Sequence, residues 1–154
     1  IIKDLAYQIW PHTYGSILSK QQLDYMLEQF YSIKNLENNL TQLNHQFYLV
    51  KEENQFVGFF STEINYNNKP TTRIHKIYLK PETQGKGFGS KVINFVEQLA
   101  LQHNNSSINL NVNRYNKALH FYIKLGFEII LQENIRLDHG YLMEDYLMEK
   151  TIKS

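Results

Sequence analysis

The stretch Gln84-Gly85-Lys86-Gly87-Phe88-Gly89-Ser90 is the most informative part of the chain. Glycines at three of its five central positions remove the Cβ atoms that would keep a ligand away from the main chain, and they permit backbone angles that other residues resist. Apolar residues at helical spacing follow directly, in Val92, Ile93, Val96, Leu99 and Ala100. We therefore expect the loop to open a helix whose first N–H groups have no partner inside the helix. Such donors favour a bound anion such as a phosphate.

The residues before the loop predict a strand and a turn. Residues 73–79 alternate in the manner of a strand, and the proline in Lys80-Pro81-Glu82 ends it. Two well-known phosphate motifs share this order of strand, loop and helix. A P-loop requires Gly-Lys-Ser/Thr four residues after its first glycine, where this chain has Ser90-Lys91. A dinucleotide fingerprint requires G-x-G-x-x-G, whereas the three glycines here read G-x-G-x-G. Neither nucleotide motif fits.

The spacing that does fit is Gln-x-x-Gly-x-Gly, with Gln84, Gly87 and Gly89 in the named places. With this motif the chain resembles the GNAT N-acetyltransferase superfamily. The segment from Asn113 to Phe127 is similar to the second cofactor segment of that family, an Asn-x-x-Ala…Phe-Tyr-x-Lys-Leu-Gly-Phe pattern. The resemblance covers residues 50–150. The first third of the chain further resembles the polyamine acetyltransferases related to PaiA, through residues 9–15 and 25–27.

The resemblance implies an α/β (α+β) fold of the GNAT type. Its central mixed, mostly antiparallel sheet would have six to seven strands flanked by about four helices, with the fourth and fifth strands splayed around acetyl-CoA. We expect a single acetyltransferase domain over residues 1–154, with the family's short first strand lying before Ile1. Hydrophobic periodicity predicts helices near residues 4–10, 20–30, 33–43, 88–103 and 116–124, and strands near residues 45–50, 55–65, 73–79, 108–112, 127–132 and 141–150.

The resemblance also implies which residues hold acetyl-CoA. The pyrophosphate would lie against the backbone from Gly85 to Ser90, including Gly87, Phe88 and Gly89, with the side chains of Gln84, Lys86 and Ser90 able to contact phosphate oxygens. The preceding strand would bond the pantetheine arm through the backbone of Ile77 and Leu79. Asn113 and Asn116 match cofactor contacts of the second segment, although Asn113 could equally cap the start of the next helix.

Acetyl transfer to an amine needs a proton for the departing thiolate and a group that takes a proton from the amine. The match to the second segment makes Tyr122 the candidate acid, because a phenol of pKa about 10 can protonate a thiolate whose conjugate acid has a pKa near 8.5. The alternative for Tyr122 is an aromatic residue packed on the sheet. His75 is the candidate base, since strand alternation places it on the same face as Ile77 and imidazole has a suitable pKa of about 6.5. A carboxylate, ordered water or a purely structural histidine are the alternatives.

The sequence thus predicts an acetyl-CoA-dependent N-acetyltransferase that acts on a primary amine of a small molecule, with a polyamine as one acceptor. The alternatives are acetylation of a protein or peptide, and an acyl-CoA-binding sensor without turnover. The family resemblance makes a homodimer a reasonable expectation, with the last strands as its interface. The residues that select the acceptor lie in loops, and one sequence does not show where those loops lie.

Composition excludes several other functions. A net charge of +1 with 20% charged residues and no basic runs argues against nucleic acid as a partner. The absence of cysteine removes disulfides and thiolate metal sites, and it suits a cytoplasmic protein. No apolar run approaches the roughly 20 residues that a membrane span needs. The six histidines show no i, i+4 pair, so no metal site is expected.

Overall fold

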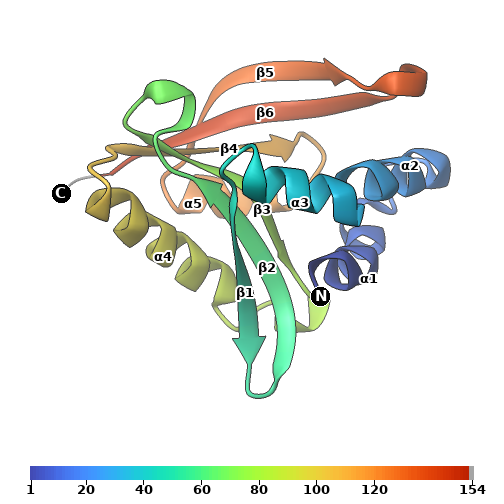
Figure 1. The fold of residues 1–154 in the computed structure, drawn as a ribbon, viewed down its shortest axis with the longest axis horizontal. Helices are drawn as coiled ribbons and strands as arrows, with labels where there is room; N and C mark the ends of the chain where they lie inside the picture. Colours follow the sequence, from blue (N-terminus) through green and yellow to red (C-terminus); the bar gives the residue numbers. More distant parts are fainter. Residues whose placement is uncertain (153–154) are drawn as a thin grey trace. The chain divides into compact units, whose positions relative to one another are not determined.

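The computed structural model describes residues 1–152 and contains five α-helices and six strands in that range. The helices are α1 (Ile2–Tyr14), α2 (Lys20–Tyr31), α3 (Ile33–Thr41), α4 (Phe88–Gln102) and α5 (Ala118–Lys124). The strands are β1 (Gln46–Glu52), β2 (Gln55–Glu63), β3 (Thr71–Leu79), β4 (Ser107–Asn113), β5 (Glu128–Arg136) and β6 (Leu142–Thr151) (Figure 1). The predicted α/β fold class is confirmed, with five helices instead of about four.

The strands form one hydrogen-bonded sheet in the order β1-β2-β3-β4-β6-β5. β3 and β4 are parallel, pairing Thr71–Ile74 with Ser107–Leu110. The pairs β1–β2, β4–β6 and β5–β6 are antiparallel. The sheet is therefore mixed and mostly antiparallel, as expected. Contacts group the chain into two compact units, one of residues 1–63 with 75–92 and the other of residues 64–74 with the chain from 93 onward. The prediction of a single domain stays a prediction.

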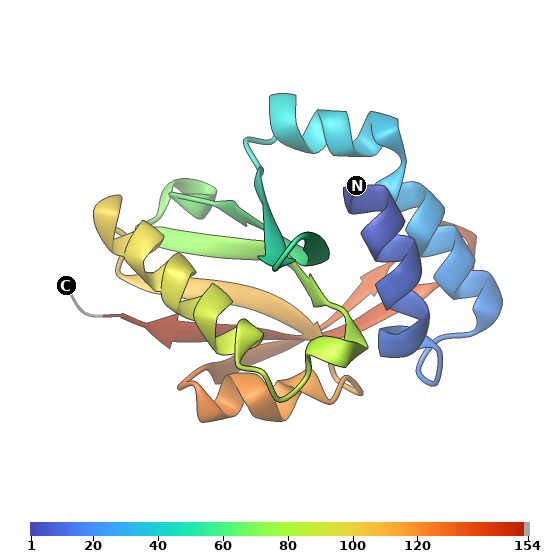
Figure 2. The same cartoon turned by 90° about the horizontal axis from the view of Figure 1, so that it is seen from below.

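Two helices of the first unit, α2 and α3, begin at serine caps. Ser19 Oγ accepts from Gln22 N–H at 3.1 Å to start α2, and Ser32 Oγ accepts from Asn35 N–H at 3.1 Å to start α3. α1 and α2 lie side by side (Figure 2) and bury apolar residues of both helices, which are Leu5, Ala6, Ile9, Trp10, Leu23, Met26, Leu27 and Tyr31. An aromatic cluster joins these helices to the sheet, through Trp10, Tyr14, Tyr31, Phe59 and Tyr78.

Helical periodicity predicted α3 correctly, and the helix ends at Thr41. Three apolar residues of this segment are nevertheless exposed, with Ile33 58%, Leu40 52% and Leu43 47% exposed. The residue of α3 that is buried is Asn39, whose amide donates to the carbonyl of Asn35. The pattern in the sequence is that of an amphipathic helix, but its apolar side is not the buried side.

The second unit is built on β4, β5 and β6. β4 alternates strictly, so Ile108, Leu110 and Val112 are buried on one face. α4 carries buried apolar residues at helical spacing, which are Val92, Ile93, Val96 and Ala100. Leu99, which belongs to the same apolar pattern in the sequence, is partly exposed. No helix among the described residues 1–152 is long and apolar enough to cross a bilayer.

Candidate active site

The glycine loop is held by a tight turn that follows β3. The N–H of Gln84 donates to Pro81 O at 3.1 Å, and the N–H of Lys86 donates to Thr83 O at 3.2 Å. Thr83 is buried and its hydroxyl donates to Lys80 O at 2.6 Å. These bonds fix the entry to the loop. They also show that one backbone donor of the predicted phosphate cradle, the N–H of Lys86, is used inside the turn.

α4 begins at Phe88, directly after the loop, and its first hydrogen bond runs from Lys91 N–H to Gly87 O at 3.1 Å. The N–H groups of the residues before Lys91 in the helix lie too early for an intrahelical acceptor. These donors belong to Phe88, Gly89 and Ser90. The positive end of the helix dipole acts at the same place. The start of α4 therefore has the chemistry of an anion site.

Gly85 and Gly87 both have positive φ, at +81° and +79°. A Cβ at either position would meet no atom within 4 Å, so the main chain of the loop borders open space. This is the arrangement that a phosphate group needs in order to approach backbone donors. The loop thus has an open backbone surface that suits an anion.

Lys86 makes an ion pair with Glu52 of β1, with 3.3 Å between Nζ and Oε2. Both side chains are well exposed, and an exposed pair of this kind contributes about 0–1 kcal/mol. The same lysine borders a cavity of about 370 Å³ whose other lining residues come from the β1–β2 turn, which are Glu52, Glu53, Asn54 and Gln55. Lys86 can exchange its weakly held carboxylate for a phosphate oxygen.

Ile77 and Leu79 lie at the end of β3 and are partly buried. Between them, Tyr78 packs on Trp10 and Phe59, and its hydroxyl lies 2.9 Å from that of Tyr14. β2 approaches this part of β3 closely, because a Cβ at Gly58 would lie 2.4 Å from Tyr78 O. The structure therefore places the predicted pantetheine strand in the same unit as the glycine loop, on a rigid support.

His75 lies on β3 beside two groups that sequence reasoning missed. Its Nε2 is 2.9 Å from Glu63 Oε1 at the end of β2. The ring of His45 stacks on it, with ring centroids 3.7 Å apart and planes inclined by 16°. His45 Nε2 lies 3.7 Å from the same Glu63 oxygen. The side chains of His45, Glu63 and His75 offer nitrogen and oxygen ligand atoms that lie within 4.8 Å of one another. The spacing of the histidines in the sequence did not indicate this group.

Lys76 follows His75 and is largely buried. Its ammonium lies 5.6 Å from the ring centroids of both Tyr31 and Phe47, and it donates to Asn39 Oδ1 at 3.2 Å. Burial lowers the pKa of Lys76 to about 8. An amine lined by two aromatic rings, with a lowered pKa, therefore follows the candidate base in the chain. Sequence reasoning missed it, because a lysine within a strand is not distinctive.

Tyr122 lies in α5 and is 6% exposed. Its ring packs edge-on against Phe121 and Phe127, with centroids 5.4 Å and 5.7 Å away. Its carbonyl accepts the N–H of Phe127 at 3.0 Å, which fixes the end of the helix. The ring of Tyr122 is thus packed against two other aromatic rings. The acid role of its hydroxyl stays a prediction.

Asn113 and Asn116 both bond backbone groups two residues on. Asn113 Oδ1 accepts from Tyr115 N–H at 2.9 Å, and Asn116 Oδ1 accepts from Ala118 N–H at 2.9 Å. Neither asparagine is the N-cap of α5, which is Lys117, so the alternative of Asn113 as the helix cap is not what the structure has. Each side chain keeps its amide Nδ2 as the donor that a cofactor oxygen would need. Their role at a cofactor stays a prediction.

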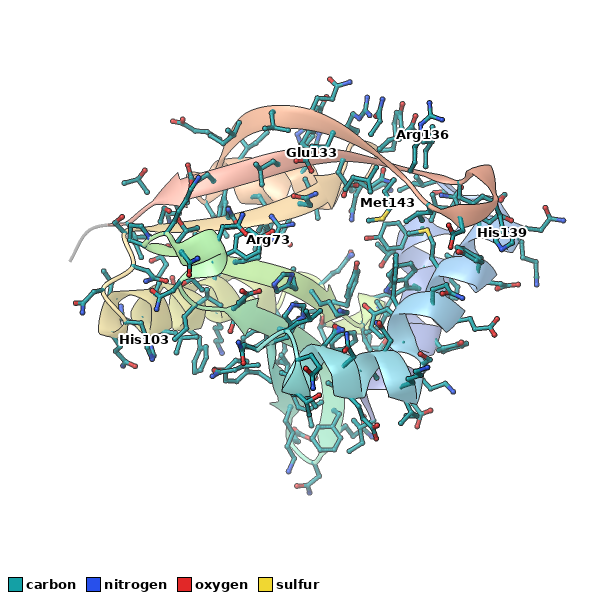
Figure 3. The ribbon with its side chains drawn as sticks, turned by 45° about the horizontal axis from the view of Figure 1, so that its top comes forward. Arg73, His103, Glu133, Arg136, His139 and Met143 are labelled. Atoms are coloured by element: carbon teal, nitrogen blue, oxygen red, sulfur yellow. The ribbon has the colours of Figure 1, made fainter. Side chains whose placement is uncertain are left out.

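A second polar group belongs to the other unit and lies on the face of β4 opposite Ile108 and Leu110. Asn111 Nδ2 donates to Glu133 Oε2 at 3.0 Å and to Asp145 Oδ2 at 3.3 Å. Burial raises the pKa of Asp145, and the nearby Glu133 carboxylate adds to this effect. Arg73, which lies on β3 in Figure 3, offsets part of it. Asn111 thus lies on the less buried face of β4 and binds two carboxylates.

A model of the acetyltransferase (GNAT) family matches residues 4–127 of this chain. The chain belongs to the GNAT acetyltransferase family. This GNAT enzyme is 25% identical to the spermidine N(1)-acetyltransferase of Thermoplasma acidophilum over 156 residues, which cover 98% of the chain and 89% of that relative. The expected resemblance to PaiA-related enzymes is thereby confirmed.

Solved structures agree with this assignment. The crystal structure of the PaiA N-acetyltransferase from Thermoplasma acidophilum in complex with coenzyme A has a TM-score of 0.77 and 25% identity, and the match covers 97% of this chain and 89% of that one. A GCN5-related N-acetyltransferase from Rhodopseudomonas palustris has a TM-score of 0.81 at 16% identity, covering 98% and 88%. The second likeness shows the fold. The family match and the relatives that are 25% identical establish the chain as an acetyl-CoA-dependent N-acetyltransferase.

Proposed function

We propose that this GNAT enzyme acetylates a primary amine of a small molecule, with a polyamine as the acceptor class. The observation that carries the donor half of the proposal is the open glycine loop at the start of α4. The acceptor half is supported by the likeness to a spermidine acetyltransferase over nearly the whole chain. In the proposed reaction the amine attacks the thioester carbonyl directly, in a complex that holds both substrates.

The donor would be held mainly by backbone groups. The N–H groups of Gly85, Gly87 and the first turn of α4 would donate to the pyrophosphate oxygens, with Gln84, Lys86 and Ser90 adding side-chain contacts. Backbone groups of Ile77 and Leu79 would bond the pantetheine arm. Because these donors lie in a loop fixed by its own hydrogen bonds, little ordering is needed when acetyl-CoA binds.

The acceptor arrives as an ammonium, since an alkylamine of pKa near 10.4 is almost fully protonated at neutral pH. His75 is the proposed proton acceptor. If its Nε2–H donates to Glu63 across the 2.9 Å contact, Nδ1 is the unprotonated nitrogen of the ring and the proposed proton acceptor. Glu63 would then be a positioning residue that fixes the tautomer of His75.

The amine nitrogen then forms a bond to the acetyl carbon, and the resulting tetrahedral intermediate collapses with cleavage of the carbon–sulfur bond. The thiolate of coenzyme A leaves with the electron pair of that bond. Tyr122 is the proposed donor of the proton that converts it to the thiol, and the phenolate regains a proton from solvent. The nitrogen loses its remaining excess proton to solvent, and His75 releases to solvent the proton that it accepted. The amide product and free coenzyme A result, with one proton released overall.

A panel of acceptors tests this proposal. The panel comprises spermidine, spermine, short diamines, amino acids, an aminoglycoside and lysine-containing peptides, with thiol release measured at fixed acetyl-CoA. We expect kcat/KM to be highest for spermidine, spermine or a diamine. A higher kcat/KM for the peptides would instead favour the alternative of a protein acetyltransferase.

His75→Ala should lower kcat about 100-fold, because a general base contributes roughly 10²–10⁴-fold. Glu63→Gln should lower kcat less, since imidazole remains and only its orientation is disturbed. KM for acetyl-CoA should stay unchanged in both variants, which steady-state kinetics would show. A rise in this KM with unchanged kcat would remove the base assignment. If the role of Glu63 were structural only, Glu63→Gln would change the free energy of unfolding and leave kcat unchanged.

We also propose a homodimer that uses the last strands. β5 is the final strand in the sheet order, and three of its consecutive apolar residues are 43–50% exposed, which are Ile129, Ile130 and Leu131. Exposed apolar edge strands are rare in monomers because they invite pairing. Sedimentation should give the mass of two chains, and Ile130→Lys should shift the protein to one chain. A monomeric wild-type protein at high micromolar concentration would contradict this proposal.

A further inference from the structure

We propose that His45, Glu63 and His75 form a binding site for a divalent transition-metal ion, with Zn²⁺ as the best-suited ion. The proposed reaction uses Glu63 and His75 and gives His45 no role. Yet His45 Nε2 lies 3.7 Å from the same carboxylate oxygen that is 2.9 Å from His75 Nε2. One carboxylate oxygen of Glu63 therefore lies near two imidazole nitrogens. Such a group of three atoms is typical of the ligands of a metal ion and is more than a single hydrogen bond needs.

The distances suit a shared ion. Zinc binds imidazole nitrogen at about 2.0–2.1 Å and carboxylate oxygen at about 2.0–2.2 Å, so two ligands of a tetrahedral ion lie about 3.4 Å apart. The nitrogen–oxygen distances of 2.9 Å and 3.7 Å in the cluster lie on either side of this value, and all three ligand atoms lie within 4.8 Å of one another. A rotation of the two stacked rings out of their parallel arrangement would bring the three ligand atoms onto one ion.

The three residues come from three neighbouring parts of the sheet. His45 directly precedes β1, Glu63 ends β2 and His75 lies in β3. The register pairs Gln46 with Thr62, which sets His45 beside Glu63. Their side chains are only 9%, 24% and 18% exposed for His45, Glu63 and His75. Strand backbones thus fix the ligands, while the partial exposure of Glu63 leaves a route for an ion.

The ligand types select the class of ion. Two imidazoles and one carboxylate suit Zn²⁺ and its transition-metal neighbours, whereas Mg²⁺ and Ca²⁺ prefer oxygen ligands alone. Three protein ligands leave a further coordination position for water or another ligand. The prediction of no metal, which rested on sequence spacing, is therefore replaced here by a specific candidate site.

Calorimetric titration of Zn²⁺ into untagged protein in chelator-free buffer tests the proposal. We expect one ion per chain with a Kd in the micromolar range or below. His45→Phe keeps a stacked ring but removes the nitrogen ligand, and it should weaken binding at least about 10-fold, because even residues that only support metal ligands contribute 10–100-fold. His103→Gln is the matched control, since His103 lies exposed at the end of α4 (Figure 3) and should bind no differently from wild type.

Two measurements decide the proposal even if His45→Phe folds poorly. Glu63→Gln should weaken Zn²⁺ binding as His45→Phe does. Co²⁺ bound to the wild-type protein should give the visible absorption of four- or five-coordinate cobalt with nitrogen ligands. Equal Zn²⁺ affinity in wild type and both variants would overturn the proposal. So would a cobalt spectrum like that of the hexaaqua ion, or Mg²⁺ binding as tight as Zn²⁺ binding.

A bound ion would have a consequence for turnover, which rests on the proposed function. A metal at Nε2 of His75 leaves the imidazole proton on Nδ1, so the ring loses the lone pair proposed to accept a proton. Zn²⁺ should therefore inhibit acetyl transfer over the concentration range in which it binds, and His45→Phe should be less sensitive. Because calorimetry needs no turnover, a failure of the metal site and a failure of the base assignment are distinguishable.

Discussion

Gly87→Gln should weaken coenzyme A binding about 100-fold or more while leaving the protein folded. Gly87 has φ of +79° and a Cβ there would point into open space, where the proposed pyrophosphate lies. A side chain at this place would exclude the phosphate from the backbone donors of the loop. Two lost hydrogen bonds to a charged group, at roughly 1.5–3 kcal/mol each, correspond to at least this change in Kd.

The chain offers a matched control for this substitution. Gly140, in the connection between β5 and β6, has φ of +76° and likewise no atom within 4 Å of a Cβ. Gly140→Gln therefore carries the same backbone strain, about 1–2 kcal/mol, outside the glycine loop. Urea unfolding should show similar losses for both variants, and calorimetry should show weakened coenzyme A binding for Gly87→Gln only. Equal affinities in the two variants would remove the pyrophosphate cradle from the account.

Tyr122→Phe should lower kcat about 100-fold, because it removes the proposed proton donor of the thiolate. The substitution keeps the ring that packs against Phe121 and Phe127, so the thermal midpoint should change little. Coenzyme A affinity should also be preserved. The expected signature is therefore a loss in kcat alone, measured by thiol release at saturating acetyl-CoA and acceptor.

Tyr7→Phe is the control for the loss of a phenol hydroxyl. Tyr7 is 44% exposed on α1, and its substitution should leave kcat within twofold of wild type, in keeping with the small effects of surface changes. If Tyr122→Phe also turns over at the wild-type rate, the proton comes from solvent or another residue. Tyr122 would then be a packing residue only.

The sequence predicted the glycine loop and the elements on either side of it well, because this segment is local. The glycine loop, the strand before it and the helix after it are contiguous, and each leaves its own periodicity or composition. The positive φ of Gly85 and Gly87 and the start of α4 at Phe88 follow from those patterns. What local reasoning missed there is small, such as the use of Lys86 N–H inside the turn.

The residues around His75 could not be found in this way, because the sheet register brings them together. His45, Glu63 and His75 are far apart in the chain, and none has a motif of its own. The pairing of β1 with β2 and the path of β3 decide that their side chains meet. At α3, apolar periodicity indicates the helix correctly but not whether its apolar side is covered. Both features depend on tertiary pairing rather than on local conformation.

The most direct test of the account is the stoichiometry of products with spermidine. Purified protein is incubated with acetyl-CoA and spermidine, and free thiol and N-acetylspermidine are quantified together, the second by mass spectrometry. We expect the two to form in equal amounts, at a rate proportional to enzyme and far above the rate without acceptor. Coenzyme A binding without any acetylated amine, across spermidine and the other small amines, would contradict the proposed function and favour an acyl-CoA sensor or a macromolecular acceptor.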